Sequence, residues 1–363
     1  MASRTVTDPP THTYKLELRS AYGPVCRDVL KTPPRDCDPS EVPVIDLSGI
    51  YGDATARKTL AATIRDAAEN TGFFYIKNHG IPSTTIDAAL AQAKAFFAQP
   101  AEKKQEISTS KSAFFNGWTE IRGTNISPSE TRDFREGFAW RYDPIYDPDQ
   151  KDHVPEEIKP WIRGEEFVWE GTSHLPGFKE DCLKYWQECL KLARRMIRIF
   201  ALALDLPETY FDDIVTFPGA DGVFNYYPAN DSLPDATIDV GLGAHTDLQS
   251  FTLLLQDSVG GLQVLTNEGQ WIKVPPIKDT FVINIGDFLM RLSNDRFKST
   301  VHRVFNIAPV DRYSMPFFFG FNFNEKCGVL PSCTSESNPA KYEPITCGEW
   351  CQLRFEQGSK KTS

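Results

Sequence analysis

The stretch Gly243–Thr266, GAHTDLQSFTLLLQDSVGGLQVLT, decides the fold class of this chain. It holds two short runs of β-forming residues, Ser250–Gln256 and Leu262–Thr266, on either side of the turn signal Gly260-Gly261. Runs of the same kind follow one another from residue 220 onward. The expected strands are Val223–Tyr227, Ser250–Gln256, Leu262–Thr266, Trp271–Val274, Phe281–Ile285, Ser299–Val304 and Met315–Phe323. Strands at this spacing predict a sandwich or a barrel.

A long amphipathic helix is expected before this β-rich half. Over 178–204, apolar residues recur at alternating spacings of three and four from Leu183 to Leu204, and Pro207 ends the pattern. We expect the apolar face of this helix to pack on a sheet. The shorter elements expected upstream are strands at Val42–Leu47 and Phe73–Ile76 and helices over 54–70 and 83–97. The chain therefore reads as α+β, with a jelly-roll core and flanking helices.

Four regions are expected along the chain. Residues 1–41 are polar and proline-rich, which predicts an irregular N-terminal arm. Residues 42–176 form an N-terminal region of helices and loops, and they show no clear period after residue 107. Residues 177–330 contain the jelly-roll core with its supporting helix. Residues 331–363 are expected to form a helical tail.

Composition excludes several classes of function. The 363 residues include 39 basic and 49 acidic ones, and a net charge of −10 disfavours binding along a nucleic-acid backbone. No segment approaches the roughly 18 apolar residues of a membrane span, and no secretory leader is recognisable. The eight cysteines form no C-x-x-C pair, which indicates reduced thiols. We expect a cytoplasmic protein that is a monomer.

Three residues have the types and spacing of a metal site. His245 and Asp247 stand two apart at the end of an expected strand, so their side chains are expected to share one face. His302 lies in another strand-like run, which a jelly roll can place beside the first. Two imidazoles and a carboxylate that leave coordination positions open suit non-haem Fe(II) and oxygen chemistry. Zinc with the same three ligands is the competing interpretation.

A second group of residues suits a carboxylate. Arg312 and Ser314 share a strand face, and a guanidinium beside a hydroxyl can bind a carboxylate group. Upstream, Asn225 and Tyr227 contribute an amide and a phenol. The sequence therefore predicts a metal near one end of a small dicarboxylate and an anion clamp at the other.

These motifs, taken in order, resemble those of one enzyme family. VPVIDL and GFFYIKNHGIP are followed by NYYP, GAHTD, GGLQV, QWIKVPP, INIGD, STVHRV, RYS and GEWCQLRF. The chain is similar, over most of its length, to Fe(II)- and 2-oxoglutarate-dependent dioxygenases of the isopenicillin N synthase-like superfamily, and it resembles the fungal members most.

The resemblance implies a fold, a cofactor set and a reaction. The fold would be a double-stranded β-helix with Fe(II) bound by His245, Asp247 and His302. 2-Oxoglutarate would chelate the metal through its 2-oxo acid end, and Arg312 and Ser314 would meet its far carboxylate. Tyr227 matches the co-substrate tyrosine of the family, and Asn225 is a weaker candidate. O₂ would convert 2-oxoglutarate to succinate and CO₂ while a C–H bond of a small organic molecule is oxidised. Hydroxylation, desaturation and ring formation or expansion are all outcomes of this chemistry, which would serve secondary metabolism.

Substrate contacts are predicted from strand adjacency and aromatic content. The residues chosen are Gln249, Phe251, Phe319, Phe321, Phe323, Phe114, Trp118 and Arg122, the last three in a loop that could close as a lid. Their aromatic bias favours a compact, partly apolar organic substrate. The stretch Asp133–Phe138 resembles one near the site in fungal members, but no residue in it receives a role.

Two other functions are compatible with the same residues. One is an iron-dependent oxidase of the isopenicillin N synthase type, in which Arg312 and Ser314 would bind the substrate's own carboxylate and no 2-oxoglutarate would be used. The other is a non-catalytic or zinc-bound jelly-roll protein. Succinate release separates the first from the dioxygenase, and metal content with Fe(II)-dependent activity separates the second.

Overall fold

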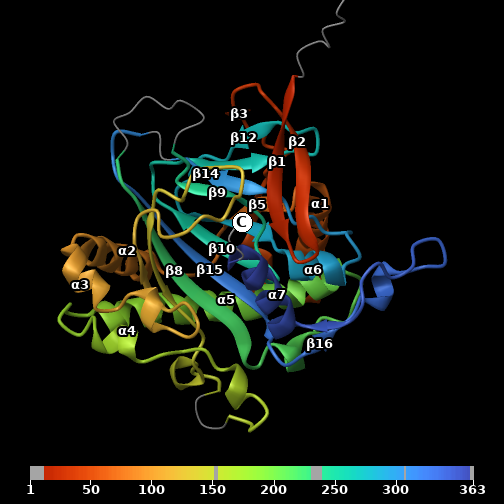
Figure 1. Cartoon of the computed structure of the whole chain (residues 1–363). Helices are drawn as coiled ribbons and strands as arrows, with labels where there is room; N and C mark the ends of the chain where they lie inside the picture. The colour runs from red at the N-terminus through yellow and green to blue at the C-terminus, as the bar shows by residue number, and fades with distance from the viewer. Residues whose placement is uncertain (1–11, 151–153, 230–238, 306–307, 360–363) are drawn as a thin grey trace, which may run out of the picture.

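The computed structural model describes residues 12–150, 154–229, 239–305 and 308–359 (Figure 1). The β-strands are β1 (Thr13–Ser20), β2 (Gly23–Leu30), β3 (Arg35–Asp36), β4 (Val44–Asp46), β5 (Phe73–Lys77), β6 (Gly117–Thr119), β7 (Glu136–Trp140), β8 (Pro218–Tyr227), β9 (Leu242–His245), β10 (Phe251–Gln256), β11 (Leu262–Leu265), β12 (Trp271–Lys273), β13 (Thr280–Ile285), β14 (His302–Val304), β15 (Arg312–Asn322), β16 (Lys326–Cys327) and β17 (Ile345–Thr346). The α-helices are α1 (Ala54–Asn70), α2 (Ser83–Phe97), α3 (Ala101–Gln105), α4 (Phe167–Glu170), α5 (Phe178–Ala203), α6 (Asp287–Leu292) and α7 (Cys347–Ser359). Short 3₁₀ turns are η1 (Leu47–Tyr51), η2 (Thr109–Lys111), η3 (Pro144–Tyr146), η4 (Lys159–Trp161), η5 (Asp212–Ile214) and η6 (Pro331–Cys333).

Two sheets face each other and form the double-stranded β-helix that the sequence predicts. The larger sheet has the strand order β4-β5-β13-β10-β15-β8-β7-β6, and the smaller has β3-β12-β11-β14-β9. A small apolar cluster fills part of the space between them and includes Phe73, Tyr75, Val264, Val282 and Val304. Side chains alternate across each strand, so every second residue of the larger sheet faces this interior.

Helix α5 packs on the outer face of the larger sheet, as its periodicity predicts. The Tyr185 hydroxyl donates to the carbonyl of Met315 at 3.0 Å, and the Trp186 ring nitrogen donates to that of Ala220 at 3.0 Å. Further along the helix, the ring of Phe200 lies 5.0 Å from that of Phe251. In Figure 1 α5 runs beneath β15. Within the described ranges, no helix has the length and apolarity needed to cross a membrane.

The prediction of an irregular N-terminal arm is wrong for residues 13–30. There β1 and β2 form an antiparallel hairpin, drawn in red in Figure 1, while residues 1–11 lie outside the described ones. Leu16 and Leu18 alternate with Lys15 and Glu17, and the two leucines are buried against Trp271 of the smaller sheet. This period of two is present in the sequence, but it is short and polar residues surround it.

The expected loop region and C-terminal tail also contain strands. Strands β6 and β7 arise from the stretch read as loops, and they extend the larger sheet beyond β8. The predicted tail is helical only in α7, since β16 pairs with β17 before it, and residues 360–363 lie outside the described ones. Thr346 and Glu349 cap α7 reciprocally, because each side chain accepts the other residue's backbone N–H, at 3.0 and 3.1 Å.

Candidate metal centre

The three predicted ligands meet between the two sheets. His245 ends β9 and His302 begins β14, and the two residues are direct partners in this antiparallel pair. One ligand atom from each of His245, Asp247 and His302 lies within 4.8 Å of the others. Asp247 Oδ1 is 3.6 Å from His245 Nε2 and 3.7 Å from His302 Nε2. Three donor atoms converge from one side, which is the arrangement of a facial metal site.

Backbone carbonyls orient both imidazoles. His245 Nδ1 lies 2.7 Å from the carbonyl oxygen of Gly243, and His302 Nδ1 lies 3.1 Å from that of Thr300. Because a carbonyl only accepts, each Nδ1 carries the proton and each Nε2 turns its lone pair toward Asp247. Burial, reinforced by the nearby His302, lowers the pKa of His245 to about 3. His245 is therefore neutral at physiological pH, the state in which an imidazole binds a metal.

Asp247 is positioned by a turn and two side chains rather than by a strand. Strand β9 ends at His245, so the expected argument from alternate residues of one strand does not hold for Asp247. Its Oδ2 accepts from the hydroxyl of Thr252 at 2.5 Å and from the amide of Asn284 at 2.6 Å. Burial opposes ionisation of Asp247, but the two histidines and these hydrogen bonds outweigh it and lower its pKa. Sequence reasoning missed both orienting residues, although Asn284 lies in the INIGD motif.

A buried guanidinium lies on the inner face of the larger sheet. Arg312 has none of its surface exposed, and its Nη2 donates to Oε1 of Gln256 at 3.1 Å. Its Nε and Nη1 are buried and have no hydrogen-bond partner among the described residues. Strand register sets Arg312 opposite Tyr227, whose ring centre is 4.7 Å from the guanidinium carbon, and sets Ser314 opposite Asn225. A buried cation with unpartnered donors fits the far carboxylate of a dicarboxylate such as 2-oxoglutarate.

Comparison with known proteins identifies the family. The model of the 2OG-Fe(II) oxygenase superfamily matches residues 221–321, and that of the non-haem dioxygenase in morphine synthesis N-terminal region matches residues 42–162. The 2-oxoglutarate-Fe(II) type oxidoreductase ppzC of Metarhizium rileyi is 44% identical over 364 residues, covering 98% of this chain and 97% of that protein. The chain belongs to the 2OG-Fe(II) oxygenase superfamily. Fe(II) and 2-oxoglutarate are thus the metal and co-substrate of this oxidoreductase.

Two further relatives extend the comparison. Azadirone synthase of Melia azedarach is 33% identical to this oxygenase, and the matched region covers 83% of this chain and 90% of that protein. The crystal structure of Neurospora crassa T7H in complex with alpha-KG and thymine superposes with a TM-score of 0.71 at 28% identity, covering 88% of this chain and 97% of that one. The fold of this oxygenase is therefore that of solved members of the superfamily.

Three of the predicted substrate contacts are wrong, because they lie on the outer face of the larger sheet. Phe251 packs on Phe200 of α5 and, at 5.3 Å, on Phe319. Phe321 lies 5.1 Å from Phe211 in the same apolar core. Arg312 and Ser314 face the interior, so Phe319, an odd number of positions further along the regular part of the strand, faces outward. Phe321 lies beyond a register shift of β15, and its contacts place it in the same outer core.

The three substrate contacts predicted in the aromatic loop also lie away from the metal ligands. Trp118 is buried in the outer core and donates its ring N–H to Glu136 at 2.6 Å, so its assignment to the substrate is wrong. Arg122 is exposed and forms an ion pair of 2.7 Å with Asp239, and Phe114 is 37% exposed. Nothing in the structure brings Arg122 or Phe114 to the metal ligands.

Gln249 and Phe323 lie beside a buried charged cluster that the sequence did not predict. The Gln249 amide donates to Asp221 at 3.0 Å, and Asp221 also pairs with Arg163 at 2.8 Å and Arg141 at 3.3 Å. The guanidinium carbon of Arg163 is 4.0 Å from the ring centre of Phe323. Sequence spacing gave no signal for this cluster, because Asp221, Arg141 and Arg163 come from three separate segments.

Phe318 is the phenylalanine of β15 that faces the interior. Its strand partners are Asp221 on β8 and Thr252 on β10, and Thr252 donates to the ligand Asp247. Phe318 lies an even number of positions from Arg312, so the two side chains share a face of the strand, and Phe318 is partly exposed. It therefore replaces Phe319 and Phe321 as the aromatic side chain of this strand that lines the interior.

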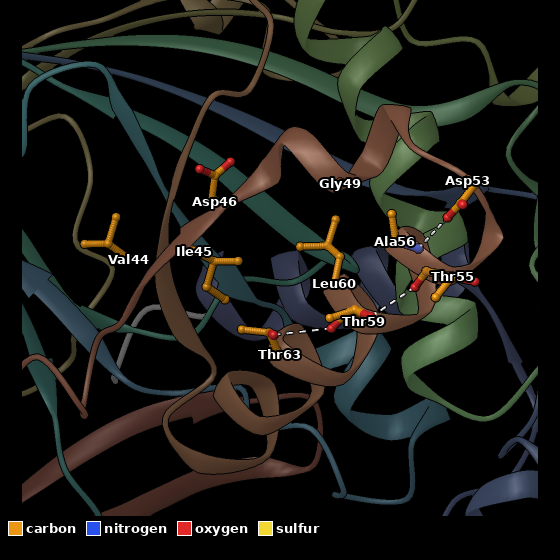
Figure 2. A pocket seen from close by; sticks show the side chains of 10 residues that line it. All are labelled: Val44, Ile45, Asp46, Gly49, Asp53, Thr55, Ala56, Thr59, Leu60 and Thr63. Atoms are coloured by element: carbon orange, nitrogen blue, oxygen red, sulfur yellow. Dashed lines mark hydrogen bonds between the residues drawn. The ribbon is translucent and has the colours of Figure 1, made fainter.

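A separate surface depression of about 610 Å³ carries no chemistry. Figure 2 shows its lining, which β4, η1 and α1 supply and which includes none of the metal ligands or Arg312. The hydrogen bonds drawn there are internal to α1 and its cap, such as Asp53 accepting from Ala56 at 2.8 Å and Thr59 donating to Thr55 at 3.0 Å. Its two carboxylates, Asp46 and Asp53, cap η1 and α1 respectively.

Proposed function

We propose that this enzyme oxidises a C–H bond of a small organic molecule and releases succinate and CO₂. In the simplest form the substrate R–H, 2-oxoglutarate and O₂ become R–OH, succinate and CO₂, so that one oxygen atom enters each organic product. Desaturation and ring formation use the same oxidising equivalents. The observation that carries the proposal is the joint presence of the three converging ligands and the buried Arg312, whose Nε and Nη1 have no hydrogen-bond partner among the described residues.

Each residue has a role in this proposal. His245, Asp247 and His302 would hold Fe(II), and Thr252 and Asn284 would fix the orientation of the carboxylate. A centre of this kind, with keto acid bound, supplies coupled oxidation of 2-oxoglutarate and of a substrate C–H bond by O₂.

The co-substrate would lie against β15 and β8. Arg312 and Ser314 would bind its far carboxylate, with the phenol of Tyr227 beside them and Asn225 at the edge. Ser314 Oγ accepts from the Asn225 amide at 3.5 Å, so the hydroxyl keeps its own proton available to the carboxylate. The apolar cluster beside the site helps to exclude water, since the ring of Phe73 lies 5.3 Å from that of His302.

The biological setting is proposed from the relatives. Azadirone synthase is named for the formation of one organic product, and ppzC carries only the name of an oxidoreductase. We place this enzyme in the biosynthesis of a secondary metabolite, acting as a cytoplasmic monomer on a small molecule. Size-exclusion chromatography with light scattering checks the oligomeric state, and a dimer would refute the monomer.

The test of the proposal is product analysis with two histidine variants. Protein loaded anaerobically with Fe(II) is given 2-oxoglutarate and O₂, and succinate is measured. His245→Ala is expected to lose iron and succinate formation together, whereas His174→Ala, at an exposed position, keeps both. O₂ uptake without keto acid would favour the oxidase, and retained turnover in His245→Ala would refute the site.

A further inference from the structure

Arg135 stands on the inner face beside the proposed co-substrate clamp. It directly precedes β7, and its Nη1 donates to Oδ1 of Asn225 at 2.5 Å. Asn225 in turn contacts Ser314 across β8 and β15. A Cβ on Gly137 would lie 2.8 Å from Nη1 of Arg135, which confirms that the guanidinium covers the inward side of β7. The sequence gave Arg135 no role.

Arg135 has no acidic partner among the residues that the structure describes. Among the described residues no carboxylate is within ion-pairing distance of it, and its Nε is buried without a hydrogen-bond partner. The adjacent Glu136 points to the other face, where it pairs with Lys104 at 2.6 Å. Asp133 is used elsewhere, since it accepts from the backbone of Gly243 at 3.0 Å. The Nε edge of the Arg135 guanidinium is therefore free to bind an anion.

The neighbouring arginines differ from Arg135, because each of them has an acidic partner. Arg141 and Arg163 face the same interior, but both pair with Asp221, at 3.3 and 2.8 Å. A buried donor without a partner is costly, and Nε of the partly buried Arg135 is such a donor. Among the described residues, the one hydrogen-bond acceptor that meets this guanidinium is the amide oxygen of Asn225.

The charges of the loaded site leave a positive excess, and this step rests on the proposed function. Fe(II), the Asp247 carboxylate, the two carboxylates of 2-oxoglutarate and the Arg312 guanidinium together are neutral. Arg135 then adds one positive charge and the buried Asp133, which forms no ion pair among the described residues, adds one negative charge. The two arginines on Asp221 leave one excess positive charge. A neutral substrate would leave this excess in place, whereas a carboxylate beside Arg135 would compensate it.

We propose that Arg135 binds a carboxylate of the organic substrate, so that the substrate of this enzyme is an organic acid. The Asn225 amide fixes Nη1, and the Nε edge of the guanidinium meets the carboxylate. The oxidised C–H bond then belongs to the part of the acid that reaches from Arg135 toward the metal.

The test compares acids with their uncharged amides. Holoenzyme loaded anaerobically with Fe(II) and saturating 2-oxoglutarate is titrated with phenylacetate, indole-3-acetate and octanoate, each against its own primary amide, by calorimetry. At least one acid is expected to bind about tenfold or more tightly than its amide, as charge-assisted hydrogen bonds allow. In Arg135→Gln this preference is lost, and in Arg135→Lys part of it returns. The control Arg198→Gln, which removes a surface ion pair with Asp212, keeps it.

Three results would overturn the proposal. Amides that bind the native enzyme as tightly as their acids would show that no substrate carboxylate is recognised. An unchanged acid preference in Arg135→Gln would assign the recognition to another residue. In Arg135→Gln, the KM for 2-oxoglutarate could rise by a larger factor than the dissociation constants of the acids. That result would assign Arg135 to the co-substrate. Failure of the proposed function is distinct, because succinate would then be absent from the native enzyme as well.

Discussion

The two faces of strand β15 have opposite chemistry. Outward, Met315, Phe317 and Phe319 pack against α5 and its neighbours in a continuous apolar core. Inward, Arg312 and Ser314 stand among polar groups, and several of these have atoms without a hydrogen-bond partner in the part of the chain that the structure describes. The buried donors and acceptors without one include atoms of Arg312, Gln256, Gln249, Arg135 and Arg163. A strand whose faces differ in this way stabilises the fold with one set of residues and binds ligands with the other.

This difference explains where stability is expected to reside. A buried phenyl ring on the outer face contributes through apolar contact, and its loss leaves a cavity. A buried guanidinium without a counterion makes no such contribution and is retained only at a cost. The outer face should therefore be sensitive in unfolding experiments, and the inner face in binding experiments.

The largest stability effect is expected on the outer face. Phe319→Ala should lower the free energy of unfolding by about 3–5 kcal/mol, because the ring contacts Phe251 in a closely packed core. Urea unfolding measures this, with Phe318→Ala as the matched control on the adjacent, inward position. The control is expected to cost less than half as much. Equal losses in the two variants would contradict the assignment of faces.

The next effect is expected at Arg312. Arg312→Leu should raise the KM for 2-oxoglutarate about 100-fold or more, since it removes the buried partner of a carboxylate. The free energy of unfolding of the unliganded protein should stay the same or rise, because an uncompensated buried charge is removed. Steady-state succinate assays and urea unfolding test the two statements.

Arg291 offers a control for Arg312. It is also buried, but the rings of Tyr342 and Trp350 cover its guanidinium at 4.6 Å each. Arg291→Leu should destabilise the fold and leave the KM for 2-oxoglutarate unchanged. If Arg291→Leu raised that KM as much as Arg312→Leu, the effect would come from the loss of any buried arginine and not from the position of Arg312.

The smallest effect is expected at Ser314. Ser314→Ala should raise the KM for 2-oxoglutarate by about three- to tenfold, the loss of one hydrogen bond to a charged group. Unfolding should change by less than about 0.5 kcal/mol, because the hydroxyl makes only a long contact with Asn225. A loss as large as that of Arg312→Leu would mean that Ser314, not Arg312, dominates the clamp.

The alternation of β15 also shows what could be read from the sequence and what could not. The metal ligands and Arg312 were predictable because each lies in a short motif of distinctive chemistry. Phe319 was assigned to the substrate although it lies an odd number of positions from Arg312, and the alternation of a regular strand alone excludes this. Phe321 follows a register shift of β15, so its outward position became known only from its contacts. Phe318, one position before Phe319, lies on the same face of the strand as Arg312.

Other features depend on contacts that no local pattern encodes. Arg135 could not be assigned a role from the sequence, because β7 follows a stretch without a clear period. The pairing of β7 with β8 is what shows that the Arg135 side chain points inward. Asp247 lies in a turn after β9, and Thr252 and Asn284, which donate to it, lie on two different strands. Each of these placements requires knowledge of which strands are neighbours.

The most direct test of the account is an anaerobic titration of the Fe(II)-loaded protein with 2-oxoglutarate, followed by visible absorption. We expect a weak charge-transfer band that saturates at one equivalent of keto acid and does not form in His245→Ala. In Arg312→Leu it should appear only at much higher concentrations of 2-oxoglutarate. Iron bound by the native protein without such a band would contradict the central claim that the two sheets enclose an Fe(II) and 2-oxoglutarate site.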